Sequence, residues 1–62
     1  MKRTKLIKHL LNNNCVLYRE GANHSIYVNL KTGKKSALPR HNEFGDVFCN
    51  EICKQFDILK IK

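Results

Sequence analysis

The stretch "HSIYVNLKTGKKSALP", residues 24–39, decides the fold of this chain. Its first half, residues 24–30, alternates between apolar and polar side chains, and a period of two residues is typical of a half-buried β-strand. The turn "KTGK" follows, with Gly33 as its flexible member. The two sides of the predicted strand carry Ile26 and Val28 on one, and Ser25, Tyr27 and Asn29 on the other.

Two further strands are predicted around this one. Residues 34–38, "KKSAL", form a short strand that ends at Pro39, because proline has no N–H to donate to a sheet. Residues 15–20, "CVLYRE", are rich in strand-forming types. The turn "EGAN" joins them to the second strand, and Gly21 is able to take a positive φ there at little cost. Two tight turns between three runs predict an antiparallel meander.

A helix is predicted on each side of the meander. Residues 4–13 begin with Thr4 as the expected N-cap, and one asparagine of residues 12–14 is expected to take the left-handed conformation that ends a helix. Asp46 opens the second helix, residues 46–56, where an acidic group suits the helix dipole. The predicted apolar faces are Leu6, Ile7, Leu10 and Leu11 in the first helix, and Phe48, Ile52 and Phe56, flanked by Cys49 and Cys53, in the second.

The predicted fold class is α+β, in the order helix, three antiparallel strands, helix, with both helices on one face of the sheet. The other face is then free for a ligand, and the polar side of the second strand, including Ser25 and Tyr27, is expected to point there. The chain has 62 residues, which predicts one domain over residues 1–62. So short a chain has no room for an enclosed cofactor cavity, and we expect a surface site.

The charge balance points to a polyanionic partner. The formal net charge is +7, from 12 Lys and Arg against 5 Asp and Glu. Positive charges gather in "MKRTKLIK", residues 1–8, and in "KTGKK", residues 31–35. A purely solvated surface needs no such excess, so nucleic-acid contact is favoured, and an acidic protein partner is compatible with it.

The cysteines predict a reducing compartment. Cys15, Cys49 and Cys53 give an odd count, and neither a secretory signal nor a membrane span precedes them. We therefore expect a cytoplasmic protein with reduced thiols and no membrane association. Zinc usually needs four ligands, and no second Cys or His pair has finger-like spacing, so buried structural cysteines are favoured over a metal site.

The carboxylates exclude two-metal phosphodiester cleavage, because Glu20, Glu43, Asp46, Glu51 and Asp57 form no close pair or cluster. Neither a metal nor another cofactor is predicted. Cleavage of RNA needs less, since the 2′-hydroxyl is its own nucleophile, a histidine can move the proton, and cations can stabilise charge on phosphorus.

His24 is the candidate for that proton transfer, with Lys34, Lys35 or Arg40 as the cations. Pairing of the second and third strands sets Lys34 at the far end from His24, whereas Arg40 and His41 lie nearer. The second proton-transfer group is left open among His41, Tyr18, a lysine and water. The alternative is a loop histidine that only contacts solvent or phosphate.

The chain resembles the HicA family of toxins, the RNA-cleaving partners in HicAB-type toxin–antitoxin pairs. The resemblance covers nearly the whole chain and is most specific in "REGANHSIY", "TGKKSALPRHNE" and "ICKQF". It implies a double-stranded-RNA-binding-like α-β-β-β-α fold and a metal-independent mRNA interferase with His24 as the catalytic residue. The expected RNA contacts are Arg19, Asn23, Ser25, Lys34, Lys35, Arg40 and His41.

The resemblance also implies a HicB-type antitoxin that binds the toxin and covers the site, and we expect a monomer when the toxin is free. Two positions depart from the family pattern. Ala22 stands where a second glycine is common, which implies strain if that position needs a positive φ. Asn14 replaces a helix-ending glycine, which is a mild change.

The alternative reading is a non-catalytic double-stranded-RNA-binding module, whose first strand turn also carries a Gly-x-x-His element. Such modules place lysines at the start of the last helix, whereas "GDVFCNEI", residues 45–52, has acids and no lysine. A third class, a protein-interaction adaptor, has to explain the charge by its partner alone.

Overall fold

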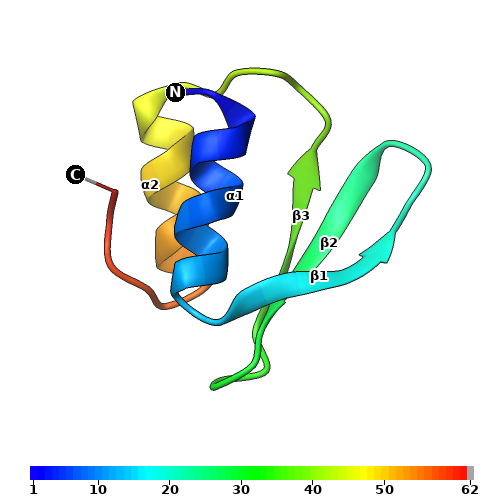
Figure 1. Ribbon diagram of the computed structural model, residues 1–62, viewed down its shortest axis with the longest axis vertical. Helices are drawn as coiled ribbons and strands as arrows, with labels where there is room; N and C mark the ends of the chain where they lie inside the picture. The colour runs from blue at the N-terminus through cyan, green and yellow to red at the C-terminus, as the bar shows by residue number, and fades with distance from the viewer. Residues whose placement is uncertain (62) are drawn as a thin grey trace.

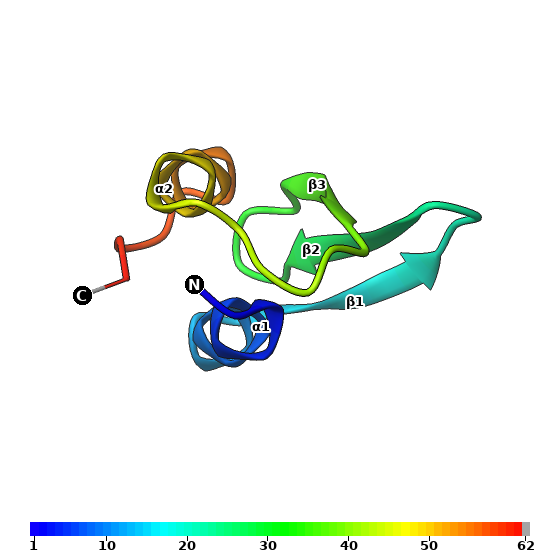
Figure 2. The same ribbon diagram turned by 90° about the horizontal axis from the view of Figure 1, so that it is seen from above.

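The computed structural model describes residues 1–61, and its element order confirms the predicted α+β fold. Figure 1 shows two helices beside a three-stranded sheet. Figure 2, seen from above, shows both helices grouped on one side of that sheet. The elements are α1 Arg3–Asn12, β1 Cys15–Glu20, β2 His24–Asn29, β3 Lys35–Pro39 and α2 Asp46–Gln55.

The sheet has the strand order β1-β2-β3, with both pairings antiparallel, so β2 is the central strand. His24 at the start of β2 lies opposite Pro39 at the end of β3. The register of β1 against β2 shifts between Leu17 and Arg19, which places a bulge in β1. The end of β1, the start of β2 and the end of β3 therefore meet at one end of the sheet, called the His24 end below.

The polar side of β2 faces the helices, so the prediction that it points to the free sheet face is wrong. Ser25 is 2% exposed, Tyr27 7% and Asn29 3%, whereas Ile26 and Val28 are half-buried on the uncovered face. The physical reason is that Ser25 and Asn29 have hydrogen-bond partners, which offsets the cost of burying them, and that the ring of Tyr27 packs in the core.

Asn29 and Ser25 illustrate these partners. The side-chain amide of Asn29 donates a 2.8 Å hydrogen bond to the carbonyl of Phe56, and its oxygen accepts one of 2.9 Å from the N–H of Lys31. The hydroxyl of Ser25 accepts a 3.1 Å hydrogen bond from Nη2 of Arg3. Phe56 and Arg3 are 27 and 22 residues away in the sequence, so a local polarity pattern carries no sign of either bond.

Helix α1 begins at Arg3, so the prediction of Thr4 as its N-cap is wrong. The N-cap is Lys2, which makes no capping hydrogen bond with its side chain. A backbone partner replaces it, because the N–H of Arg3 donates to the carbonyl of Asn42 at 2.9 Å. After the helix, Asn14 has a φ of 66°, which confirms that an asparagine takes the left-handed conformation there.

The core lies between the helices and the sheet. Leu6 and Leu10 of α1 are fully buried, but Leu11 is 52% exposed, so the apolar face of this helix is narrower than predicted. The residues after α2 return over the core, where Ile58 and Ile61 pack. Among residues 1–61, no helix is both long and apolar enough to cross a membrane. The buried apolar side chains are Leu6, Leu10, Cys15, Tyr27, Leu38, Phe44, Cys49, Ile52, Cys53 and Phe56.

Candidate functional site

His24 is the first residue of β2, and its side chain is exposed. Because side chains alternate along a strand, its imidazole projects from the same uncovered face as Ile26 and Val28. No helix covers this face, so a ligand can reach the ring directly.

The turn before His24 is tight because of a close backbone approach. The N–H of Gly21 donates a 2.7 Å hydrogen bond to the carbonyl of His24, and a Cβ on Gly21 would lie 3.1 Å from that oxygen. Gly21 does not use its freedom to take a positive φ, and what distinguishes the position is this close approach to the backbone. Ala22 has no positive φ either, so the backbone strain that a positive φ would cause at this alanine does not arise.

Arg40 ties this turn to the end of β3. Its Nη2 donates to Oε2 of Glu20 at 2.7 Å and to the carbonyl of Gly21 at 2.5 Å. Both partners of the ion pair are well exposed, with 43% and 53% of their side chains accessible, so the pair contributes only about 0–1 kcal/mol to stability. Its effect is positional, because Arg40 links the end of β3 to the β1–β2 turn within a few residues of His24.

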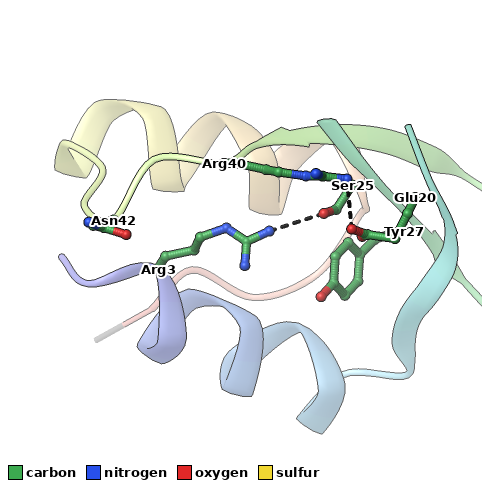
Figure 3. Close-up of a pocket in the computed structure, with 6 residues that line it drawn as sticks. All are labelled: Arg3, Glu20, Ser25, Tyr27, Arg40 and Asn42. Atoms are coloured by element: carbon green, nitrogen blue, oxygen red, sulfur yellow. Dashed lines mark hydrogen bonds and ion pairs between the residues drawn. The ribbon is translucent and has the colours of Figure 1, made fainter. Parts of the chain in front are cut away.

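A pocket of about 300 Å³ opens on the other face of the sheet at this same end, between the sheet and α1 (Figure 3). Arg3 reaches into it from the first turn of α1, donating through Nη2 to Ser25 Oγ at 3.1 Å and through Nε to the carbonyl of Pro39 at 3.5 Å. The lining residues are Arg3, Glu20, Ser25, Tyr27, Arg40 and Asn42.

The predicted RNA-contact residues divide between the two ends of the sheet. Asn23, Ser25, Arg40 and His41 lie at the His24 end, within two positions of His24 or of Pro39, its partner on β3. Ser25 is the exception in orientation, because its side chain is buried beneath the helices rather than displayed on the uncovered face.

Arg19 and His41 have different surroundings. Arg19 is exposed and lies opposite Ile26, two residues along β2 from His24. His41 is exposed and stacks on Phe44, with ring centroids 6.1 Å apart. This contact holds the imidazole of His41 against a residue of the core.

The lysines lie at the other end of the sheet. Lys35 pairs with Val28, and Lys34 precedes it in the β2–β3 turn, which confirms the expected separation of Lys34 from His24. The ammonium of Lys35 lies 4.3 Å from the centroid of the Tyr18 ring, a cation–π contact on the uncovered face. Tyr18 is thereby associated with the lysine end.

Sequence reasoning missed three polar groups of the pocket: Arg3, the hydroxyl of Tyr27 and Asn42. Arg3 stands in a run of basic residues with nothing to distinguish it, and its contacts are 22 and 36 residues away. Tyr27 was expected on the opposite face of the sheet. No local signal identifies such a site, since it forms only when α1 packs against the ends of β2 and β3.

The three cysteines are free and buried, as predicted for structural residues. Burial raises the pKa of the Cys15, Cys49 and Cys53 thiols, which keeps them protonated and unreactive. Within residues 1–61, no group of three or more His, Cys, Asp and Glu side chains is placed to hold a metal ion.

Compared with known proteins, the chain matches no protein-family model, no curated protein and no solved structure.

Proposed function

We propose that this chain is a metal-independent endoribonuclease of the HicA type, the toxin of a toxin–antitoxin pair that cleaves mRNA. The observation that carries the proposal is the exposed His24 at the end of the sheet where Arg40, His41 and the Arg3 pocket also lie. The exposed histidine can move the proton, and Arg19, exposed opposite Ile26, supplies a cation on the same face, which are the groups that RNA cleavage needs.

In the proposed reaction, His24 takes the proton of the RNA 2′-hydroxyl as that oxygen attacks phosphorus. The new bond joins the 2′-oxygen to phosphorus, and the bond to the 5′-oxygen breaks. A second group gives a proton to the leaving 5′-oxygen, so the products are a 2′,3′-cyclic phosphate and a 5′-hydroxyl. The exposed guanidinium of Arg19, opposite Ile26 on the uncovered face, is placed to stabilise the charge on the pentacoordinate phosphorus.

Among the candidates for the second group, His41 or a water that it orients is favoured. His41 follows Pro39, the cross-strand partner of His24, by two residues. Lys35 lies opposite Val28, four residues along β2 from His24, and the ring of Tyr18 is occupied by its contact with Lys35. No cofactor takes part in the proposed reaction.

The proposed protein partner is a HicB-type antitoxin that covers the uncovered sheet face. That face presents His24 together with the half-buried Val16, Ile26 and Val28. A net charge of +7 favours a partner with an acidic surface. The free toxin is proposed to be monomeric and cytoplasmic.

Expression in cells tests the enzymatic part of this proposal. Wild type and His24→Gln are induced separately, and mRNA integrity is followed by gel and primer extension. We expect the wild type to fragment mRNA and His24→Gln to leave it intact, because the catalytic proton carrier is lost. Equal fragmentation by both proteins would sink the assignment of His24.

His9→Gln is the matched control, since it changes a histidine of α1 whose ring bonds the carbonyl of Leu59 at 2.7 Å, away from the sheet end. This variant should fragment mRNA as the wild type does. The double-stranded-RNA-binding alternative predicts instead that the wild type protects duplex RNA, leaves mRNA whole and loses affinity on substitution of His24.

A further inference from the structure

The guanidinium of Arg3 carries a charge that no carboxylate balances within residues 1–61. The ion pair of this part of the chain joins Arg40 to Glu20, and both hydrogen-bond partners of Arg3 are neutral oxygens, those of Ser25 and Pro39. Arg3 is half-buried in the wall of the pocket. A partly desolvated charge without a counter-charge is costly, so this position favours an anion.

The other groups around Arg3 suit the same ligand. Tyr27 is 7% exposed, and Figure 3 shows its ring below Ser25 with the hydroxyl directed toward α1 and Arg3. Asn42 adds an amide at the opposite wall, beside the start of α1 (Figure 3). The first turn of α1 contains no acidic residue, so the positive end of the helix dipole is not offset there.

The pocket is large enough for a hydrated oxyanion, because about 300 Å³ equals the share of about ten liquid waters. Glu20 also lines it, but its carboxylate is bonded to Arg40 at 2.7 Å, which leaves Arg3 as the unpaired charge. Arginine is well suited to phosphate, since its planar fork of donors matches two oxygens.

We propose that this pocket binds a phosphate group of the RNA chain, held by Arg3, the hydroxyl of Tyr27 and Asn42. The proposal rests on the proposed function in that it concerns the same substrate. Its new content is the site: a phosphate subsite on the helix-covered side of the sheet, separate from the His24 ring on the uncovered side.

Register explains how one RNA strand reaches both places. Ser25, in the pocket, directly follows His24, and the carbonyl that accepts from Nε of Arg3 belongs to Pro39, which lies opposite His24. The ring and the pocket are therefore on the two faces of the same sheet end. A single strand with one phosphodiester at His24 passes around this end and places a neighbouring phosphate against Arg3.

The test uses purified full-length protein and a single-stranded 2′-O-methyl RNA, which lacks the nucleophile and is not cut. Fluorescence anisotropy gives the affinity of wild type, Arg3→Gln and the matched control Lys54→Gln, which removes one charge from the exposed last turn of α2. Arg3→Gln should weaken binding about tenfold, as expected for one charge-assisted hydrogen bond. The salt slope should fall by about 0.7.

Lys54→Gln should weaken binding by less than about twofold. Equal affinities of Arg3→Gln and Lys54→Gln would overturn the proposal. Because Arg3 also links α1 to the sheet, Tyr27→Phe provides a second variant that keeps the ring in the core and removes only the hydroxyl. It should weaken binding about threefold, and inorganic phosphate should shift the Arg3 side-chain NMR signal of the wild type. If Tyr27→Phe bound RNA as tightly as the wild type, and phosphate did not shift the Arg3 signal, the proposed phosphate site would also be contradicted.

A cleavage assay on ordinary RNA separates the two proposals. If His24→Gln loses cleavage while Arg3→Gln binds as tightly as Lys54→Gln, RNA cleavage by His24 is supported and the phosphate site is contradicted. If wild type cuts no RNA but Arg3→Gln still loses affinity, the phosphate site is supported and the proposed endoribonuclease activity is contradicted.

Discussion

The two faces of β2 are arranged in the reverse of the usual order, since the polar face lies under the helices and the apolar face is uncovered. The face under the helices is lined by Ser25, Tyr27 and Asn29, all buried, and the uncovered face presents Ile26 and Val28. Ser25 and Asn29 are held there by hydrogen bonds with Arg3 and Phe56, which are distant in the sequence, and Tyr27 contributes its buried ring to the core. The uncovered face makes no contact with the helices, so His24 at its end remains accessible to a ligand.

This contrast makes its strongest prediction for His24 itself. His24→Gln should lower the rate of RNA cleavage by about 10²–10⁴, because a proton carrier is lost. It should change the free energy of unfolding by less than about 0.5 kcal/mol, because the side chain is exposed. Single-turnover cleavage and urea unfolding of the same samples measure the two effects. If His24→Gln lost much stability and cleaved RNA at an unchanged rate, His24 would have a structural role and not a catalytic one.

Asn29 is the matching test of the covered face. Asn29→Ala should lower the free energy of unfolding by about 2–3 kcal/mol, since the buried carbonyl of Phe56 loses its 2.8 Å donor. The neighbouring Val28→Ala, on the uncovered face, should cost less than about 1.5 kcal/mol. Urea unfolding of both variants compares them, and equal costs would remove the distinction between the faces.

Much of the fold could be predicted from the sequence, because period-two and period-four patterns and two short turns are local signals. The side of β2 that is buried could not, because it depends on Phe56 and Arg3, which bond Asn29 and Ser25 across the core. Alternation shows that a strand has two faces, but the availability of hydrogen-bond partners decides which one is covered.

The candidate site was predictable in the same uneven way. The position of His24 followed from the turn, and its distance from Lys34 followed from strand pairing. The tight contact at Gly21 could not be predicted, because the approach of 3.1 Å between a Cβ at this position and the carbonyl of His24 exists only in the folded turn. The role of Arg3 could not be predicted, because it is one of several basic residues near the start of the chain and only the packing of α1 brings it to Ser25.

Substitution of Ile26 tests what the uncovered face binds. Ile26→Thr should cost less than about 1.5 kcal/mol of stability, because the side chain is only half-buried. If the proposed antitoxin covers this face, its affinity for the variant should fall about tenfold. Isothermal titration with the purified partner measures that change, and unchanged affinity would place the antitoxin elsewhere.

The covered side makes the smallest prediction, a pH effect from its thiols. Burial raises the folded-state pKa of Cys15 and Cys53 above the ordinary value of 9.0. Above about pH 9 the unfolded chain releases these protons and the folded chain retains them, so stability should fall as the pH rises further. Denaturant midpoints at pH 7.5 and 9.5 check the direction. Substitution of both cysteines by alanine should flatten this dependence.

The bulge in β1 has a consequence for behaviour in a crowded cell. The two outer strands of an open sheet are sites where a second chain can add and begin an aggregate. Here β1 is interrupted between Leu17 and Arg19, and β3 stops at Pro39, which has no N–H to offer. These two features interrupt the regular row of pairing groups along each edge, so we expect concentrated samples to resist fibril formation.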